Sequence, residues 1–373
     1  MNTTGSTTPL PRDLVAPSSV GIHDGRLSVL IDRVRQDVVN GPLPSAQIAV
    51  ARHGQPVAFE TFGDSGPSVR YITQSAGRPL LAACVWKLMS DGLLEIDQPV
   101  ASVLAPFGAN GKEKVTFRHV LTHTGGFPMA PIRYEAMRDR KVRLEAMARW
   151  RLDAEPGTVM RYHLTSAAWV IADTIEELTG LPLPRYLEQE ISRPLGLDIE
   201  LGVPADRQAD TVAPMVAIGD VPSGWEPDPW GPWYFRDPEV LAAGEPSHTI
   251  CSTALDTVLL FQSMYHTALF SPDVIALATG RVAEMQSLDI RGGPGPFAVK
   301  GLFVNVDDGP RTASPSTWGH GGAPSSFTWH DPEVDLSIAF YNNGYPATGY
   351  DTGRSGRNRS LVLSTLAGDL IDD

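Results

Sequence analysis

Segments with the pattern of β-strands lie at both ends of this sequence, far apart along the chain. Residues 46–63 alternate apolar and polar side chains on either side of a turn at residues 53–56, as a β-hairpin does. Three more strands are predicted near the other end, at residues 299–306, 325–330 and 335–343. The middle of the chain shows mostly helical patterns and loops rich in Pro and Gly. We therefore expect an α/β (α+β) fold with one antiparallel sheet built from both termini.

Helices are expected to flank this sheet, and a mostly helical lobe is expected between its two parts. Residues 26–39 carry an apolar stripe with helical spacing, and residues 359–371 carry another. Residues 292–297 (GGPGPF) are expected to be a plain linker back into the sheet. A chain of 373 residues is too long for one compact core, which agrees with two lobes. The predicted units are a discontinuous sheet domain (residues 24–104 and 286–373), a helical inserted lobe (residues 105–285) and an N-terminal arm (residues 1–23).

The charge balance limits the classes of partner. The chain has 30 Lys and Arg residues against 43 Asp and Glu residues, which gives a formal net charge of -13. No basic stripe is available to neutralise phosphates, so nucleic acids and anionic membranes are not expected as partners. The N-terminus lacks the pattern of a signal peptide, and no apolar run approaches the ~18 residues that a membrane span needs. We expect a cytoplasmic protein that binds a small molecule.

One short stretch places a serine where a helix begins. Ser75 precedes a helix predicted at residues 79–91, and Arg78 follows the serine by three residues, so both side chains can share one face. The free N–H groups and the positive dipole end of a helix stabilise an anion at such a position. On its own, however, Ser-x-x-Arg occurs by chance, and its simplest interpretation is a helix cap followed by a solvated arginine.

Three later segments give this serine a context. They are VTFRHVLTHTGGFP (residues 115–128), PGTVMRYHLTSAAWVIADTIEELTG (156–180) and WGHGGAPSSFTW (318–329). Their order resembles that of the serine β-lactamase and penicillin-binding-protein superfamily. Within it, the sequence is most similar to the class C-like branch, which includes family VIII carboxylesterases, D-amino-acid peptidases and acyltransferases. Other landmarks, such as KLMSDGLLEIDQPV after the first helix and CSTALDTVLLFQSM at residues 251–264, extend the resemblance over residues 24–370.

The resemblance implies a site for acyl transfer. It places the family's nucleophile on Ser75, its tyrosine on Tyr162 and its strand motif on residues 320–322 (His-Gly-Gly). It also implies an oxyanion hole made by the backbone N–H groups of Ser75 and Ala323. Gly322 would leave room for the substrate carbonyl to approach. The resemblance implies no cofactor and no metal.

Two positions depart from the family's pattern. Arg78 stands where the resemblance expects a lysine, and Leu164 stands where it expects an asparagine. A desolvated lysine can give up its proton and act as a base, whereas a guanidinium cannot be deprotonated in a protein. Lys87 cannot replace that base, because it lies roughly 13 Å further along the same helix. Leu164 removes a polar group that would position a substrate amide, which argues against β-lactam or peptide substrates.

Three arrangements could replace the missing lysine. Arg78 could act as a fixed cation beside Tyr162, since an opposite charge within ~4–6 Å favours the ionised form of a phenol. His163 or His320 could carry the proton instead, because imidazole titrates near neutral pH. Alternatively, Ser75 is not acylated, and the pocket binds and polarises a substrate for a different reaction.

Two further features bear on the pocket. Residues 225–238 (WEPDPWGPWYFRDP) concentrate aromatic side chains among prolines. They form either a loop packed on the helical lobe or an aromatic wall over the pocket, with Trp230 and Trp233 as substrate-binding residues. His119 and His123 have a spacing that can hold a metal, but no acidic third ligand lies nearby in the sequence. We therefore predict no metal site.

The sequence favours a serine-hydrolase-like enzyme, namely an esterase, amidase or acyltransferase that acts through Ser75 on a small aromatic or polyketide-like metabolite. The second hypothesis is a cyclase, isomerase or lyase of specialised metabolism that uses the same pocket without an acyl-enzyme. The third is a binding protein without catalytic activity. The fold alone does not separate these hypotheses, because function depends on the site.

Overall fold

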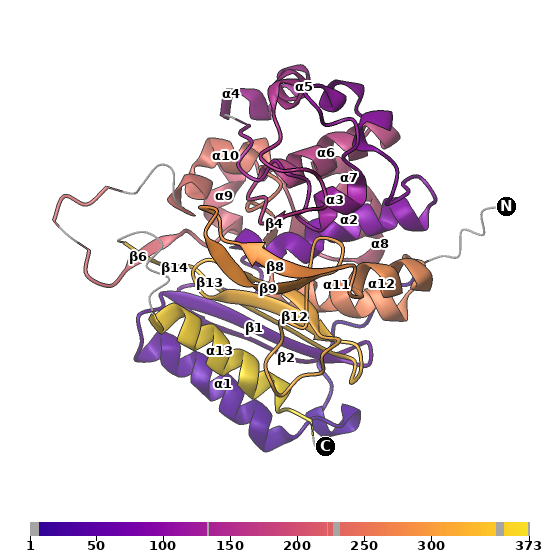
Figure 1. The fold of residues 1–373 in the computed structure, drawn as a ribbon. Coiled ribbons are helices and arrows are strands. Elements are labelled where there is room, and N and C mark those ends of the chain that lie inside the picture. The colour runs from indigo at the N-terminus through magenta and orange to yellow at the C-terminus, as the bar shows by residue number, and fades with distance from the viewer. Residues whose placement is uncertain (1–6, 133, 222, 227–231, 348–353, 372–373) are drawn as a thin grey trace.

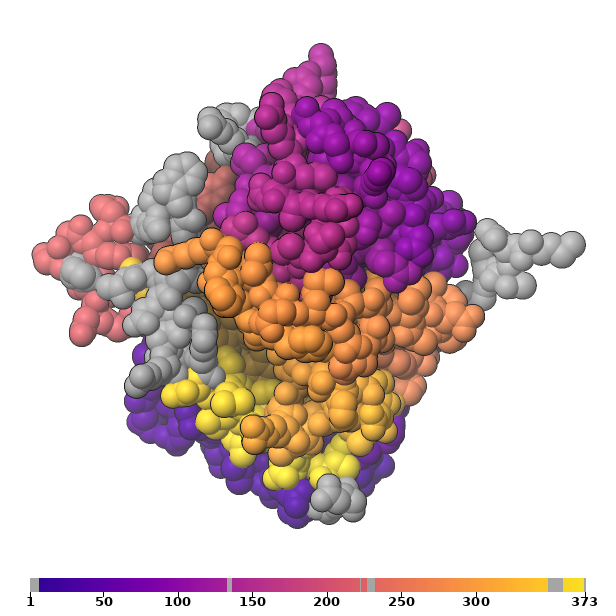
Figure 2. Space-filling view, viewed as in Figure 1, coloured from indigo at the N-terminus to yellow at the C-terminus, as the bar shows by residue number. Residues whose placement is uncertain are grey.

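A large sheet with helices on both faces forms the body of the molecule in the computed structural model (Figure 1). The structure describes residues 7–132, 134–221, 223–226, 232–347 and 354–371. Figure 1 shows a mostly helical part above the sheet and the two terminal helices below it. In the space-filling view the orange residues near 300 fill the boundary between the magenta helical part and the yellow C-terminal elements (Figure 2).

The main sheet has nine strands in the order β2-β1-β13-β12-β11-β10-β9-β8-β4. Its strands are β1 (Ser45–Arg52), β2 (Gln55–Gly63), β4 (Met160–Arg161), β8 (Ala283–Leu288), β9 (Pro294–Lys300), β10 (Asn305–Val306), β11 (Trp318–Gly322), β12 (Ser326–Asp331) and β13 (Leu336–Asn342). The N-terminal hairpin joins the C-terminal strands through an antiparallel β1–β13 pair, in which Ile48 faces Phe340. Only the pairing of β4 with β8 is parallel within this sheet. The prediction of a mostly antiparallel sheet built from both ends is therefore confirmed.

Two small sheets accompany the main one. They consist of β3 (Tyr71–Ile72), β7 (Cys251–Ser252) and β5 (Ile199–Glu200), and of β14 (Gly344–Pro346) with β6 (Val216–Ile218). The first sheet ties the segment before Ser75 to residues 251–252 through antiparallel pairs such as Ile72 with Cys251. This connection matters for the site, because it fixes where the serine turn begins.

The helices cover both faces of the main sheet. They are α1 (Asp24–Val39), α2 (Arg78–Ser90), α3 (Phe117–Leu121), α4 (Tyr134–Met137), α5 (Arg140–Arg149), α6 (Ser166–Thr179), α7 (Leu183–Tyr186), α8 (Arg193–Leu195), α9 (Ala205–Thr211), α10 (Pro238–Ala243), α11 (Ala254–His266), α12 (Pro272–Thr279) and α13 (Arg354–Gly368). The terminal helices α1 and α13 lie together on one face, and α11 packs against β1 and β13 on the other. Within the described ranges, no helix combines the length and the apolar character that a membrane span requires.

Two predictions about residues 292–306 were wrong. The strand expected at 299–306 is interrupted, because β9 ends at Lys300 and β10 begins at Asn305. Between them the chain dips into the core, where Leu302 O accepts a hydrogen bond from Trp86 Nε1 and Phe303 adopts a φ of 71°. The expected linker at 292–297 instead forms the start of β9, whose first residue is the Pro294 that suggested a linker. Proline is tolerated at the first position of a strand.

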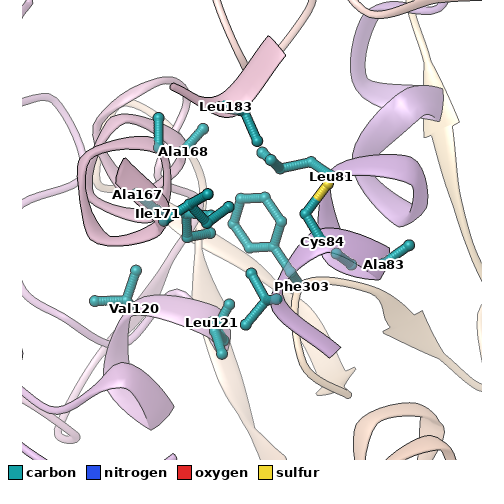
Figure 3. Packing of buried hydrophobic residues seen from close by; sticks show 14 of the residues in the cluster. Leu81, Ala83, Cys84, Val120, Leu121, Ala167, Ala168, Ile171, Leu183 and Phe303 are labelled. Atoms are coloured by element: carbon teal, nitrogen blue, oxygen red, sulfur yellow. The ribbon is translucent and has the colours of Figure 1, made fainter. Parts of the chain in front are cut away.

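The largest core cluster surrounds α2 and holds it rigidly. Apolar side chains from α2, α3 and α6 meet Phe303 there (Figure 3). Cys84 of α2 is fully buried in this cluster, and burial raises the pKa of its thiol. A helix buried on nearly every side cannot rotate without disturbing this packing. The residues at its N-terminus are therefore held in fixed positions.

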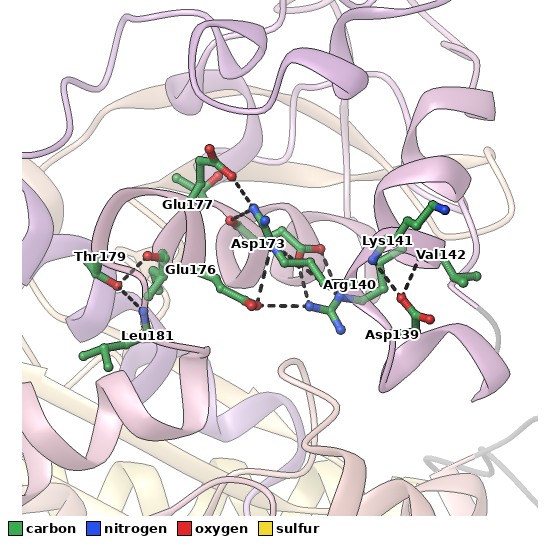
Figure 4. A network of polar contacts seen from close by, with 12 residues as sticks. Asp139, Arg140, Lys141, Val142, Asp173, Glu176, Glu177, Thr179 and Leu181 are labelled. Carbon is green, nitrogen blue, oxygen red and sulfur yellow. Dashed lines mark hydrogen bonds and ion pairs between the residues drawn. The ribbon is translucent and has the colours of Figure 1, made fainter.

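A polar network clamps α5 to α6. Asp173 of α6 is fully buried and accepts a hydrogen bond of 2.7 Å from Arg143 Nη2, while Arg140 pairs with Glu177 at 2.5 Å. Figure 4 shows Arg140 of α5 facing the acidic side chains of α6. Because α6 begins directly after residues 162–165, this clamp fixes the segment that carries the predicted tyrosine.

Candidate active site

Ser75 lies in a short 3-10 helix, η2 (Gln74–Gly77), which leads directly into α2. The turn is anchored on both sides. Thr73 N and Thr73 Oγ1 both donate to Ile250 O, at 3.0 Å and 2.9 Å, and Gln74 N donates to His248 O at 3.1 Å. On the opposite side, Thr328 Oγ1 of β12 donates to Ala76 O at 2.9 Å. The serine is therefore presented at a helix start by a backbone that is fixed before and after it.

Tyr162 is brought into contact with this serine. Its hydroxyl donates a hydrogen bond to Ser75 Oγ at 3.2 Å. Tyr162 follows β4 and precedes α6, so the contact joins the helical part of the molecule to the helix that starts at Arg78. A phenol within hydrogen-bond reach of a serine hydroxyl is placed to exchange a proton with it.

Arg78 is a buried cation between two aromatic rings. Its side chain is 1% exposed, and its guanidinium carbon lies 4.7 Å from the centroids of both the Tyr162 and Phe303 rings. Nη2 donates to His163 O at 3.3 Å and also to Leu164 O. Nε and Nη1 have no partner in the part of the chain that the structure describes. The cation thus lies over the face of the tyrosine ring in a cation–π arrangement.

Leu164 contributes to the site through its backbone. The resemblance implied that its side chain replaces a polar asparagine, and the structure adds that its carbonyl oxygen helps to hold Arg78. The side chain itself is half-buried.

The backbone holds both ring nitrogens of His163, which argues against its carrying the proton. Its Nδ1 donates to Arg161 O at 2.8 Å, and its Nε2 accepts a hydrogen bond of 3.3 Å from Phe127 N. Burial, followed by the nearby charges of Arg78 and Arg161, lowers the pKa of His163 to about 3. Both ring nitrogens are therefore occupied by backbone groups, and the imidazole is neutral.

His320 lies beside Tyr162 but is a weak base. The two ring centroids are 5.7 Å apart, and His320 Nδ1 donates to Gly321 O at 2.6 Å. Burial lowers the pKa of His320 to about 3, and the charges of Lys300 and Arg78 lower it further in the same direction. A base is most effective when its pKa lies near the operating pH, so His320 is better placed to accept a hydrogen bond than a proton.

The end of β11 lies against the serine turn. A Cβ atom at Gly322 would lie only 2.7 Å from Ala76 N and 2.9 Å from Ala76 Cβ, which no side chain tolerates without movement. Glycine at this position therefore permits the close approach of β11 to η2. Ala323 follows directly, so its backbone lies next to the turn that carries Ser75. The N–H of Ser75 belongs to the first turn of a helix, where N–H groups lack an intrahelical partner.

The aromatic segment is only partly described. Trp233 belongs to a 3-10 helix, η6 (Pro232–Arg236), and is 2% exposed. Its ring makes an edge-to-face contact with Trp225, with 5.2 Å between the ring centroids. It borders a cavity of about 860 Å³ that also reaches Ile72, three residues before Ser75. Trp230, the other predicted substrate-binding residue, lies outside the described residues.

Comparison with known proteins places these features in a family. A model of the family described as "Beta-lactamase" matches residues 30–362 of the chain. The chain belongs to the Beta-lactamase family. It is therefore a member of the serine hydrolase superfamily that contains β-lactamases and penicillin-binding proteins, with family VIII esterases among its neighbours.

Named relatives of this family member are esterases and carboxypeptidases. A protein of Escherichia coli O157:H7 named "Putative D-alanyl-D-alanine carboxypeptidase" is 27% identical over 287 residues, covering 69% of this chain and 64% of that protein. The chain thus spans less than two thirds of that relative's length. "Esterase EstB" of Burkholderia gladioli is 28% identical over 209 residues, covering 48% of this chain and 53% of that protein.

A solved family VIII carboxylesterase shares the fold of this family member. The two structures superpose with a TM-score of 0.76 at 20% identity, over 92% of this chain and 98% of the other. This likeness supports the fold, including the sheet with helices on both faces.

Lys300 is a residue of the site that the sequence did not single out. It borders a cavity of about 320 Å³ together with Tyr162, His123 and Asn305, and its Nζ donates to Asn305 Oδ1. Burial lowers the pKa of Lys300 to about 8, with Arg78 acting in the same direction. No local signal could have identified it, because Lys300 stood inside an apparently regular strand pattern.

Proposed function

We propose that this member of the Beta-lactamase family is a serine-type hydrolase or acyltransferase whose nucleophile is Ser75. The observation that carries the proposal is the 3.2 Å contact between Tyr162 Oη and Ser75 Oγ, backed by a buried arginine 4.7 Å from the tyrosine ring. A nucleophilic serine needs a group that removes its proton, and among the residues predicted for this task Tyr162 contacts the hydroxyl. In this proposal Arg78 takes the place of the lysine of the class C-like branch as an electrostatic partner, not as a base.

The reaction follows from these positions. Ser75 Oγ attacks the carbonyl carbon of the substrate while its proton passes to the phenolate oxygen of Tyr162. The resulting oxyanion is held by the N–H groups of Ser75 and Ala323, each of which contributes about 10²–10³ in rate at comparable sites. Tyr162 then gives the proton to the leaving group, and the acyl chain stays on Ser75 until water or another acceptor removes it.

We propose the substrate class from the apolar side chains near the serine turn. The cavity that Trp233 and Ile72 border does not include Ser75 itself, but Ile72 lies three residues before it, and the aromatic and aliphatic side chains of this cavity suit an aromatic or polyketide-like acyl group. Leu164 offers no side-chain amide to position a peptide bond. A relative named as an esterase supports ester chemistry for this chain. We therefore propose an ester, amide or thioester of a small molecule as substrate, and neither nucleic acid nor membrane as partner, in keeping with the net charge of -13.

A panel of chromogenic substrates tests this proposal. We expect measurable hydrolysis of p-nitrophenyl esters with aromatic or medium-length acyl groups, and its loss in Ser75→Ala. Nitrocefin should be turned over negligibly, because Arg78 and Leu164 replace the groups that the resemblance associates with β-lactam binding. Robust nitrocefin hydrolysis would refute the substrate class, and ester hydrolysis that survives in Ser75→Ala would refute the nucleophile.

A further inference from the structure

A buried carboxylate and an imidazole form a pair next to the serine turn. Glu245 is 0% exposed, and His248 is 3% exposed. The carboxylate accepts hydrogen bonds from His248 Nδ1 at 3.1 Å, from His248 N at 2.9 Å and from Ser247 N at 3.2 Å. Burying an ionised carboxylate costs free energy that hydrogen bonds must offset. The donors of these three bonds all lie two or three residues after Glu245 in the same loop. We call these two residues the Glu245–His248 pair.

The pair is attached to the backbone of the nucleophile. His248 O accepts the hydrogen bond from Gln74 N, the residue directly before Ser75, and Gln74 itself has a φ of 51°. The imidazole stacks on Phe235 with 4.1 Å between ring centroids and 18° between planes. Phe235 belongs to the aromatic segment that borders the large cavity. His248 thus lies between the serine turn and the wall of that cavity.

The hydrogen bonds leave one nitrogen of His248 available. Nδ1 carries the proton that Glu245 accepts, so Nε2 is an acceptor, and it has no hydrogen-bond partner among the residues that the structure describes. Burial lowers the pKa of His248, and the charge of Arg78 lowers it as well, whereas Glu245 raises it. His248 also contributes to the lowered pKa of His320. The imidazole is therefore neutral near pH 7 and oriented by a carboxylate, as a general base needs to be.

The other candidate bases lack these properties. Both nitrogens of His163 are occupied, His320 has a pKa of about 3, and the guanidinium of Arg78 cannot lose a proton. Lys300, whose pKa burial lowers to about 8, is mostly protonated at neutral pH and donates to Asn305 Oδ1. A carboxylate that fixes the tautomer and orientation of an imidazole is the arrangement used by serine hydrolases to move protons.

We propose that His248 is the base of the second half-reaction, in which the acyl-enzyme on Ser75 is resolved, and that Glu245 is its positioning residue. The proposal rests on the proposed function, because it requires an acyl group on Ser75. Tyr162 and His248 then divide the reaction, with Tyr162 serving acylation and His248 serving deacylation.

Deacylation transfers one proton to His248 and back. A water molecule, or the hydroxyl of an acceptor, loses its proton to His248 Nε2 as its oxygen bonds to the acyl carbon. The tetrahedral intermediate then collapses, the bond between the acyl carbon and Ser75 Oγ breaks, and Oγ takes up the proton from Nε2. The products are free Ser75 and a carboxylic acid, or an ester when an alcohol is the acceptor.

Pre-steady-state hydrolysis of p-nitrophenyl acetate separates the two half-reactions. In His248→Phe, which keeps a ring on Phe235 but removes both nitrogens, we expect the burst of p-nitrophenol to persist. The steady-state rate should fall about 10²- to 10⁴-fold, the usual contribution of a general base, and the acetylated protein should accumulate in intact-mass spectra. Ser247→Ala is the matched control, because it removes a buried hydroxyl that has no partner among the described residues and leaves its backbone bond to Glu245 intact.

Glu245→Gln separates a role in catalysis from a purely structural role, because only a catalytic role predicts a change in the kcat–pH profile. A carboxylate raises the pKa of its histidine, so its loss should shift the ascending limb of the kcat–pH profile to lower pH and reduce kcat. It also keeps the test decisive if His248→Phe fails to fold. Wild-type steady-state turnover in His248→Phe, or an unshifted limb in Glu245→Gln, would overturn the assignment while Ser75 still acylates. A wild-type protein with neither burst nor acetyl-Ser75 would instead overturn the proposed function, and this assignment with it.

Discussion

At the scale of single residues, the position of Arg78 decides how the serine can be activated. Its guanidinium carbon lies 4.7 Å from the ring centroids of both Tyr162 and Phe303, and Nη2 donates to the backbone oxygen of His163. One of the three arrangements considered from the sequence put this cation beside the phenol, and the structure puts it over the ring. A positive charge there can stabilise negative charge that develops on the tyrosine oxygen during the reaction.

Replacing Arg78 therefore tests this role directly. In Arg78→Met the reaction loses the buried cation over the Tyr162 ring, which would stabilise negative charge that develops between Ser75 and Tyr162 in the transition state. We expect kcat at neutral pH to fall about 10- to 1000-fold, the range of effects that one neighbouring charge can have. Steady-state kinetics at pH 7 measure this effect. Arg78→Lys should retain more activity than Arg78→Met because it keeps the charge.

Tyr162→Phe gives the matching control. It should reduce kcat/KM at least as much as Arg78→Met, and the double variant should be little worse than either single variant, because the two side chains act as one unit. Near-wild-type turnover in Tyr162→Phe would show that another group takes the proton from Ser75.

At the scale of elements, the contact between β11 and η2 makes a further prediction. A methyl group at Gly322 would meet Ala76 N at 2.7 Å, so Gly322→Ala must push β11 away from the serine turn. Since Ala323 follows directly, the oxyanion hole would open, and kcat should fall by about 10²-fold or more. Gly66→Ala is the control, because a Cβ at that glycine meets nothing within 4 Å. Equal kcat values for both variants would contradict the proposed oxyanion hole.

The clamp between α5 and α6 makes a prediction about stability. Asp173→Asn removes the fully buried carboxylate that pairs with Arg143 and leaves that guanidinium only Glu176 at 3.3 Å, which should lower the free energy of unfolding by about 3–5 kcal/mol. Asp97→Asn breaks an ion pair in which the Asp97 side chain is 67% exposed, and should cost about 0–1 kcal/mol. Urea unfolding curves of the two variants measure the difference. Similar losses in both would show that the buried pair does not hold the helices together.

At the scale of the whole molecule, periodic patterns predicted most of the architecture. Residues 46–63 formed the β1–β2 hairpin and residues 335–343 contained β13, because alternation along a half-buried strand is visible in the sequence itself. The break at Gly301–Val304 was not predictable in the same way. An apolar run of this length fits a continuous strand as well as it fits a segment that leaves the sheet. Only the tertiary contacts with α2 and α3 show that this segment enters the core.

The sequence predicted those residues of the candidate site that belong to recognisable motifs. Ser75, Arg78 and Tyr162 were named from short segments, and the structure brings all three together. Lys300 and the Glu245–His248 pair carry no motif, and their relation to the serine arises from pairing between distant segments of the chain. Such relations depend on the tertiary fold, so reasoning from one sequence does not show them.

Covalent labelling shows whether Ser75 is an activated nucleophile. The folded protein would be treated with a fluorophosphonate probe, and its intact mass would be measured before and after. We predict a single adduct on the wild-type chain, mapped to Ser75 by peptide analysis and absent from Ser75→Ala. A folded wild-type protein that stays unlabelled, or an adduct that persists in Ser75→Ala, would contradict the claim.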